Sequence, residues 1–294
     1  MKIKSSISRK IFNVFNILIV SIFAFLCMYP FYYIIIYSLS TPELAIRGVY
    51  FWPRGFTFVN YIRIFADNAL FYAFLMSILR TVLGTVVTLI FCTMFAYGIS
   101  KPFLPFRRIM YRGLVVTMYI SVGIIPWFVT MRNYGLQNNF LLYILPSAMG
   151  AFFVVLLKTF FEQLPSSMEE AAKLDGAGYF RIFISVILPL STPILATIAL
   201  FSGVGQWNSW FDNFMLNRDP RLQTLPFVLF VYLNSQSINL DITNVTAEHI
   251  AQIRLTPQSI RAAVTAIVAI PIFLLYPFVQ RYFVKGLLIG AVKG

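Results

Sequence analysis

Long apolar stretches separated by short polar segments dominate the pattern of this chain. A helix needs about 20 apolar residues to cross a hydrocarbon core about 30 Å thick, and no stretch shows the residue-by-residue alternation of a membrane β-barrel. The stretches that are long enough lie at about residues 11–39, 71–98, 109–131, 140–161, 186–210 and 260–283. The pattern therefore predicts an all-α polytopic membrane protein with six transmembrane helices.

The remaining segments are interpreted as the tails and loops of one domain. Residues 11–283 then form a single six-helix transmembrane domain between a basic tail, residues 1–10, and a C-terminal tail, residues 284–294. The external loops lie at about 40–70, 132–139 and 211–259, and the largest cytoplasmic loop at about 162–185. No segment indicates a separate soluble domain.

Composition and charge agree with a lipid environment. Hydrophobic residues make up 59% of the chain and charged residues 11%, whereas soluble domains have roughly 45–50% and about 25%. The net charge of +13 could suggest a nucleic-acid partner, but such proteins gather Lys and Arg on one solvated face. Here the basic residues form short runs between apolar stretches, so lipid and not nucleic acid is the expected partner.

The positions of the lysines predict the orientation, because the cytoplasmic loops of membrane proteins carry an excess of Lys and Arg. With the N-terminus inside, six spans return the C-terminus to the same side. The lysines that then lie in the cytoplasm are all of those in the chain: Lys2, Lys4, Lys10, Lys101, Lys158, Lys173, Lys285 and Lys293. The expected topology is N-in and C-in.

The spans carry almost no charge, and this bears on how transport is driven. No Asp or Glu lies in the middle of a span, whereas ion-coupled transporters keep acidic residues there as relays or ligands. A gradient-driven secondary transporter or channel is therefore the weaker alternative. The exception is Arg80, inside the second stretch. It either bonds to neighbouring helix carbonyls or reaches the interface, or it faces a cavity where it pairs with substrate or gates the outer mouth.

The sequence shows no arrangement that supports catalysis. It lacks the G-x-x-x-x-G-K-[ST] phosphate-binding loop and anything typical of a catalytic triad, a carboxylate pair or a metal site. A membrane enzyme acting on lipid-linked sugars is therefore disfavoured. The chain is expected to be non-catalytic, to hold no cofactor or metal, and to depend on another chain for energy.

The loop at 162–185 has a pattern of its own. Ser167 with Glu170 three residues later indicates a capping box, and a short helix is expected from about Met168 to Leu174. Gly176 permits a sharp backbone turn after that helix. A solvated amphipathic connector has the same features, so the pattern alone leaves a connector and a docking helix both open.

The same loop resembles the EAA motif, E-A-A-x(3)-G-x(9)-I-x-L-P, of inner-membrane permeases of binding-protein-dependent ABC importers. Glu170-Ala-Ala-x-x-x-Gly176 is followed by nine residues and then by Val186-x-Leu188-Pro189, with Val186 in place of Ile. The basic tail and six spans are similar to the carbohydrate-uptake branch, its MalG-type permeases and its lipoprotein-permease-like group. The resemblance implies a MetI-like permease fold in a bacterial plasma membrane.

In such permeases the EAA helix is a coupling helix that docks into a cytoplasmic ATPase. The resemblance implies that Glu170 pairs with a basic residue of the ATPase and that Ala171 and Ala172 pack in its cleft. The residues implied in ATPase coupling are Glu169, Glu170, Ala171, Ala172, Leu174, Asp175, Gly176, Leu188 and Pro189. The implied partners are a second permease subunit in a heterodimer, two ATPase subunits that bind ATP and Mg²⁺, an extracytoplasmic solute-binding protein, and a carbohydrate, expected to be an oligosaccharide.

The end of the fifth stretch combines flat aromatic rings with amides, as sugar-binding sites do. Gln206, Trp207, Asn208 and Trp210, together with Arg80, are the candidate substrate pathway. Trp and Tyr also gather at membrane interfaces without any ligand. An interfacial aromatic belt is therefore the alternative for the two tryptophans.

Overall fold

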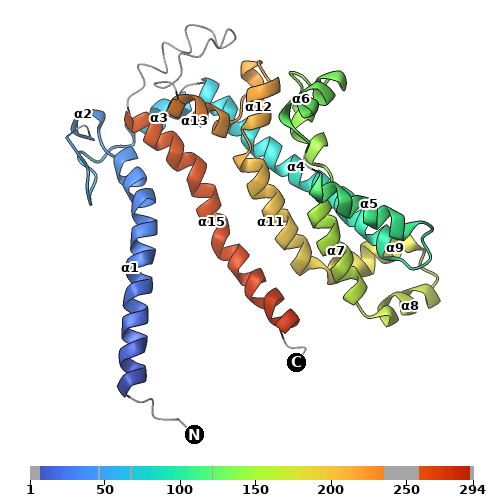
Figure 1. Cartoon of the computed structure of the whole chain (residues 1–294). Helices are drawn as coiled ribbons and strands as arrows, with labels where there is room; N and C mark the ends of the chain where they lie inside the picture. Colours follow the sequence, from blue (N-terminus) through green and yellow to red (C-terminus); the bar gives the residue numbers. More distant parts are fainter. Residues whose placement is uncertain (1–6, 46, 67, 121, 235–257, 292–294) are drawn as a thin grey trace. The chain divides into compact units, whose positions relative to one another are not determined.

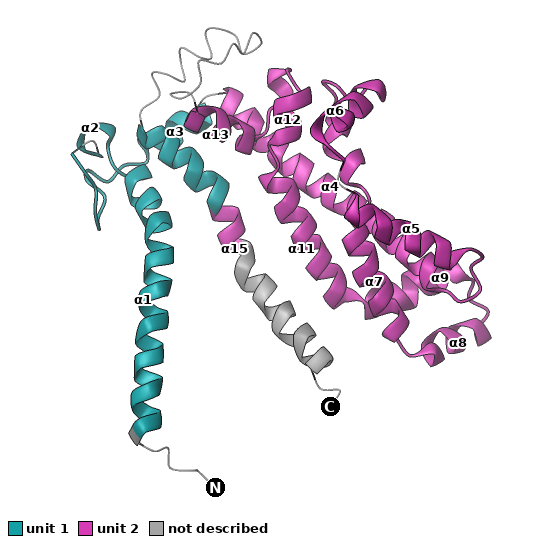
Figure 2. Ribbon diagram, viewed as in Figure 1, with its two compact units in different colours: residues 1–67, 247–269 teal, residues 68–246, 270–294 magenta. Residues whose placement is uncertain are grey.

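The computed structural model describes residues 7–45, 47–66, 68–120, 122–234 and 258–291, with side chains for all of these except residue 7 and residues 275–291. Its regular structure is helical (Figure 1). Within the described residues, strand-like pairing is limited to an isolated antiparallel bridge between Ser40 and Phe56. The chain divides into unit 1, Met1–Asp67 with Ala247–Ala269, and unit 2, Asn68–Thr246 with Ile270–Gly294 (Figure 2). Each unit has a core of its own.

Unit 1 is built on a long apolar helix whose C-terminal end is fastened to the segment that follows it. Its elements are α1 (Ile7–Ser38), α2 (Pro42–Ala45), α3 (Val59–Ala66) and the first residues of α15 (Gln258–Ala291). Asn60 of α3 is fully buried, and its Nδ2 donates to the carbonyls of Ser38 and Ser40 at 2.8 and 3.0 Å. These bonds satisfy carbonyls that have no partner beyond the end of α1. The apolar side chains at 11–28 of α1 are exposed, as expected of a helix whose surroundings are lipid or another subunit.

Unit 2 is organised around α4 (Asn68–Ser100), which packs against α7 and α11. The buried face of α4 carries small and hydroxyl side chains, which allow helices to approach closely: Ser77, Gly84, Thr88, Cys92 and Ala96. The other elements are α5 (Arg107–Tyr119), α6 (Ile124–Asn133), η1 (Phe140–Tyr143), η2 (Leu145–Ser147), α7 (Ala151–Gln163), α8 (Ser166–Leu174), α9 (Tyr179–Ile182), η3 (Phe183–Ile187), α10 (Leu188–Leu190), α11 (Thr192–Asn208), α12 (Phe211–Leu216), η4 (Pro220–Leu222) and α13 (Leu225–Asn234).

Two of the predicted spans are single helices, and two others are bent. α1 and α4 are each long and apolar enough to cross a membrane. The segment Phe140–Ser147 meets α7 at 46°, and the segment Tyr179–Leu190 meets α11 at 81°. Up to four spans therefore follow from the length and composition of the described residues if each bent pair is one span.

The third predicted span, at about 109–131, is formed by two helices and not by one. α5 ends at Tyr119 and α6 begins at Ile124. Gly123 precedes α6 in an extended conformation, and Pro126 lies in the first helical turn, where the missing proline N–H needs no partner. Hydropathy runs through this break without change, so the apolar pattern alone did not reveal it.

The fifth predicted span, at about 186–210, is bent near its start. The long helix α11 begins at Thr192, and the bend falls at Ser191, between Pro189 and Pro193. Each proline lacks an N–H donor and so weakens a continuous helix at this point. The five residues before α10 form a π-helix, Phe183–Ile187.

The predicted outer loop at 211–259 contains helices in its first half. α12, η4 and α13 occupy residues 211–234, and α13 packs on α4. The apolar run of α13 is too short to cross a membrane. The second half of that loop, residues 235–257, lies outside the described residues, as do residues 1–6 and 292–294 of the two tails.

Candidate functional site

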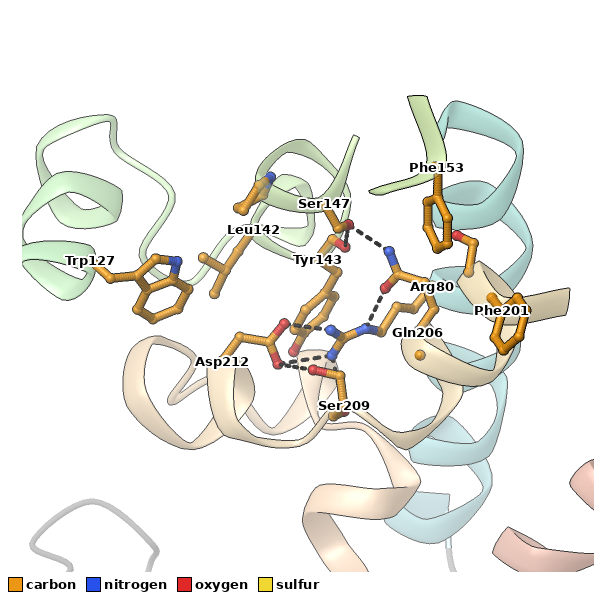
Figure 3. A pocket seen from close by; sticks show the side chains of 13 residues that line it. Arg80, Trp127, Leu142, Tyr143, Ser147, Phe153, Phe201, Gln206, Ser209 and Asp212 are labelled. Carbon is orange, nitrogen blue, oxygen red and sulfur yellow. Dashed lines mark hydrogen bonds and ion pairs between the residues drawn. The ribbon is translucent and has the colours of Figure 1, made fainter. Parts of the chain in front are cut away.

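Unit 2 contains a cavity of about 280 Å³ between α4, α11, α12 and the η1–η2 segment (Figure 3). Its walls combine aromatic rings with hydroxyl, amide and charged groups. The lining residues are Arg80, Trp127, Leu142, Tyr143, Pro146, Ser147, Phe153, Phe201, Ser202, Gly205, Gln206, Ser209 and Asp212. Figure 3 shows Trp127 on one side of the charged groups, and Phe153 and Phe201 on the other.

An ion pair between Arg80 and Asp212 forms one wall of the cavity. Nη1 of Arg80 donates to Oδ1 of Asp212 at 2.9 Å, and Nη2 donates to Oδ2 at 2.5 Å. This two-point geometry is the strong form of an arginine–carboxylate pair. Nε of Arg80 donates to Oε1 of Gln206 at 3.1 Å, and Nη1 also donates to the carbonyl of Ser209 at 3.2 Å. Arg80 is only 3% exposed, and its charge is neutralised within the chain.

The ring of Tyr143 packs against the arginine of this ion pair. Its ring centroid lies 4.5 Å from Cζ of Arg80, within the range of a cation–π contact. Its hydroxyl donates to the carbonyl of Leu222 at 2.5 Å and accepts a hydrogen bond from Nδ2 of Asn213 at 2.8 Å. Oδ1 of Asn213 in turn accepts from the backbone N–H of Thr224 at 3.2 Å. A continuous polar network therefore fixes α12 and η4 against the cavity.

Gln206 links α11 to two other elements. Besides accepting from Arg80, its Nε2 donates to Oγ of Ser147 at 2.6 Å. The side chain lies directly over Gly84 of α4, where an added Cβ would come within 2.5 Å of Nε2. A side chain at position 84 would therefore force Gln206 to shift, and this shift disturbs its bonds to Arg80 and Ser147.

The other residues of the candidate substrate pathway do not line this cavity. Trp207 is buried, and its ring meets that of Phe74 at 6.4 Å in an edge-on arrangement. Trp210 stacks on Phe230 with ring centroids 4.0 Å apart. Asn208 is exposed and donates from Nδ2 to the carbonyl of Val204 at 3.0 Å. Of the five predicted residues, Arg80 and Gln206 come together in the cavity.

The segment with the EAA pattern contains a helix that ends in a defined cap. α8 stops at Leu174, and Gly176 has a φ of 78°, a conformation that favours glycine. The N–H of Gly176 donates to the carbonyl of Lys173, and that of Ala177 to the carbonyl of Ala172, each at 3.0 Å. These two bonds form a Schellman motif, so the predicted turn is present.

The start of α8 differs from the predicted capping box. The helix begins at Ser166, and Pro165 occupies the cap position without a side-chain hydrogen bond. Ser167 therefore lies within the first turn and not before it. The fixed φ of proline suits a helix start, and this explains why the helix begins earlier than the Ser167–Glu170 spacing predicts.

The predicted coupling residues have different surroundings. Glu169 forms an ion pair with Lys101, and Ala172 packs on the core of unit 2. Leu188 also packs on that core, whereas Pro189 is exposed at the bend. The exposed group comprises Glu170, Ala171, Leu174, Asp175 and Gly176, and Leu174 is 90% exposed. Only part of α8 is therefore free to meet another protein.

Several residues of these sites were not found from the sequence. They are Asp212, Tyr143 and Ser147 at the cavity, and Lys101 beside α8. One signal was present for Asp212, because a charged residue within a span needs a partner and Arg80 lies well inside the second predicted span. The sequence did not show which acid it was, since the two residues are 132 positions apart.

Comparisons with known proteins give a consistent result over the whole chain. The sequence is 35% identical over 286 residues to protein LplC of Bacillus subtilis (strain 168), covering 97% of this chain and 96% of that one. It is 34% identical over 274 residues to the polygalacturonan/rhamnogalacturonan transport system permease protein YtcP of the same organism, with 92% and 94% covered. It is 28% identical over 277 residues to the arabinooligosaccharides transport system permease protein AraQ of Halalkalibacterium halodurans, with 92% and 93% covered.

A solved structure agrees with these relatives. A chain in the crystal structure of a bacterial ABC transporter involved in the import of the acidic polysaccharide alginate matches with a TM-score of 0.83 and 31% sequence identity. The match covers 96% of this chain and 100% of that one. No family model matches the sequence.

Proposed function

The chain belongs to the family of permease subunits of carbohydrate ABC importers, and we propose that it forms half of the translocation pathway for an oligosaccharide. The observation that carries this proposal is the nearly end-to-end match to a transport system permease, 34% identical over 92% of the chain. The subunit is non-catalytic, and ATP and Mg²⁺ bind to partner ATPase subunits. A second permease subunit and an extracytoplasmic solute-binding protein complete the importer.

The proposed topology has six spans in the bacterial plasma membrane with both termini in the cytoplasm. The long helices α1 and α4 and the two bent pairs support four of these spans. The third is assigned to α5 with α6, and the sixth to α15. This orientation places Lys101, Lys158 and Lys173 together on the cytoplasmic side, as the positive-inside rule requires.

The proposed docking surface for the ATPase is the exposed face of α8. Glu170 is exposed and makes no ion pair with the residues that the structure describes, so its carboxylate is available to a basic group of another subunit. Ala171 and Leu174 beside it are also exposed and offer apolar contact. Glu169 and Ala172 instead hold α8 to the rest of the permease.

The cavity at Arg80 is proposed as part of the sugar path. Sugars bind through flat aromatic faces flanked by hydroxyl and amide groups, and Trp127, Ser147 and Gln206 supply these here. Because Asp212 already neutralises Arg80, the cavity presents hydrogen-bonding groups without a free positive charge. Trp207 and Trp210 then hold the end of α11 in place through their ring contacts and do not touch the sugar.

The proposal is tested by purifying the tagged chain from its native membranes and identifying the proteins that accompany it. A second permease, a P-loop ATPase and a binding protein are expected. Uptake is then measured with a panel of labelled oligogalacturonides, arabino-oligosaccharides and alginate oligosaccharides, the sugars named for the relatives. Import that needs ATP and survives the collapse of ion gradients supports an ABC importer. Import that is lost with the gradient and independent of ATP overturns it in favour of a secondary transporter.

A charge reversal tests the docking surface within the same system. Glu170→Arg is expected to abolish uptake while the protein still inserts in the membrane, because the reversed charge repels the basic group of the ATPase. Glu43→Arg is the matched control, since Glu43 is equally exposed on a short helix, α2, in unit 1. Uptake that persists in Glu170→Arg contradicts the assignment of α8 to ATPase coupling.

A further inference from the structure

Lys101 connects α8 to α4. It directly follows the last residue of α4, and its Nζ forms an ion pair with Oε1 of Glu169 in α8. The same ammonium group lies 4.3 Å from the ring centroid of Tyr97. The side chains of Lys101 and Glu169 are 12% and 15% exposed, so solvent screens this pair far less than a surface pair.

Tyr97 ties this contact to the core of unit 2. The residue is 8% exposed, and its ring centroid lies 5.0 Å from that of Phe183 and 6.3 Å from that of Phe161. These two phenylalanines belong to η3 and α7. Lys101 therefore binds α8 to a packed group of rings that joins α4 to two other elements.

The C-terminal end of α8 is linked to the turn that follows α4, the turn that also contains Lys101. Nζ of Lys173 lies 5.3 Å from the ring centroid of Tyr179, and that ring lies 4.9 Å from the ring of Phe103. Phe103 is two residues after Lys101 in the turn that follows α4. Both ends of α8 are thus in contact, directly or through one ring, with residues 101–103.

The two adjacent glutamates of α8 have opposite surroundings. Glu169 points to Lys101 within the chain, whereas Glu170 is exposed. One face of α8 is therefore bound to the end of α4 while the neighbouring face is free. The Lys101–Glu169 pair gives α8 a direct side-chain link to the end of α4, beside its contacts with α9 and η3.

We propose that Lys101 is a positioning residue for transport, which transmits the movement of α8 to α4 through Glu169. This inference rests on the proposed function, in which an ATPase moves α8. α4 also carries Arg80 in the cavity wall, and the 20 residues between Arg80 and Ser100 extend over about 30 Å of helix. The pair is largely shielded from water, so separating it leaves two poorly solvated charges without partners. A displacement of α8 therefore moves the end of α4 with it.

The measured quantity is the number of sugar molecules imported per ATP hydrolysed, in proteoliposomes that contain the whole importer with its binding protein. The probe is the labelled oligosaccharide from the panel above that the wild-type complex imports. Lys101→Met and Glu169→Gln are each expected to lower this ratio by roughly tenfold, a size typical of coupling between sites. A defect in folding or assembly lowers import and hydrolysis together and leaves their ratio unchanged.

Three further variants test whether the loss comes from the Lys101–Glu169 contact itself. Lys101→Arg keeps the positive charge and the ring contact, so we expect its ratio of sugar imported to ATP hydrolysed to stay close to that of the wild type. The double variant Lys101→Met/Glu169→Gln is expected to lose no more than either single variant, because both changes remove the same link. Lys158→Met is the matched control, since Lys158 also pairs with a glutamate and lies 4.4 Å from the ring of Tyr111, but its partner Glu162 belongs to its own helix, α7.

The outcomes separate this inference from the function on which it rests. If the wild-type complex imports no sugar with ATP, the proposed function fails and takes the inference with it. If the wild type is active and Lys101→Met or Glu169→Gln keeps the wild-type ratio, the inference alone is overturned. It is also overturned if the two losses multiply in the double variant, or if Lys158→Met lowers the ratio equally. If Lys101→Met does not assemble, the ratio of import to hydrolysis in the milder variant Glu169→Gln alone tests the inference.

Discussion

Two sites along α4 carry the same chemical arrangement in two different forms. Inside the helix Arg80 pairs with Asp212 over the ring of Tyr143, and just after its last residue Lys101 pairs with Glu169 over the ring of Tyr97. Arg80 makes four hydrogen bonds through three nitrogens. Lys101 offers a single ammonium group to its carboxylate.

This difference suits the two sites to different tasks. A planar guanidinium held at several points fixes the orientation of its partner, whereas a lysine ammonium is a point charge on a flexible stem. The Arg80 site is therefore a rigid joint between α4, α11 and α12. The Lys101 contact keeps α8 attached to α4 while the angle between the two helices changes, as a helix moved by another subunit requires.

The largest effect is expected where the Arg80 joint is broken on one side. Asp212→Ala leaves a buried guanidinium without its counter-charge, and such losses cost about 3–5 kcal/mol of folding free energy. The thermal unfolding midpoint of the detergent-solubilised protein should fall steeply, whereas Glu43→Gln, an exposed carboxylate in unit 1, should leave it unchanged.

A second variant shows whether the charge itself is the cause. Replacing both partners by apolar residues, Arg80→Met with Asp212→Leu, removes the unpaired charge and should recover most of the lost stability. A double variant as unstable as Asp212→Ala contradicts the explanation. Equal midpoints for Asp212→Ala and Glu43→Gln contradict the idea of a rigid joint.

The next effect compares two glycines of α4, one near each joint. Gly84→Ala places a Cβ 2.5 Å from Nε2 of Gln206, and moving that amide breaks its bonds to Arg80 and Ser147. Overpacking of this kind costs about 1–3 kcal/mol. At Gly98 an added Cβ meets nothing within 4 Å, so Gly98→Ala should be neutral or raise stability by about 0.5–1 kcal/mol, as alanine does inside helices. Similar unfolding midpoints for the two variants would show that Gln206 is free to move.

The sequence predicts the parts of this fold that depend on local pattern. The apolar stretches at 11–39 and 71–98 correspond closely to α1 (Ile7–Ser38) and α4 (Asn68–Ser100), because length and apolarity decide both. The turn at Gly176 was equally predictable from the glycine after an amphipathic helix. The bend at Ser191 was not, since the residues on both sides of it are apolar and hydropathy carries no information on backbone direction.

Contacts between distant residues lie beyond such a pattern. Arg80 was a candidate from the sequence because a charge within a span is unusual, but its partner Asp212 was assigned to an outer loop. Only the folding of α12 onto α4 brings the two together. In the same way, the EAA resemblance placed both Glu169 and Glu170 at the ATPase, whereas the position of Lys101 in space distinguishes them.

The smallest effect is expected at the cap that ends α8, the helix that Lys101 holds. Gly176 has a φ of 78°, and a side chain in this conformation costs about 1–2 kcal/mol. Gly176→Ala should fray the last turn of α8, where Lys173 contacts Tyr179, and lower the sugar imported per ATP by a few fold. Gly178→Ala is the matched control, because Gly178 has a φ of −72° and open space around its Cβ position. If both alanine variants keep the wild-type ratio, the shape of the α8 terminus does not affect coupling. The link between α8 and α4 then depends on Lys101 and Glu169 alone.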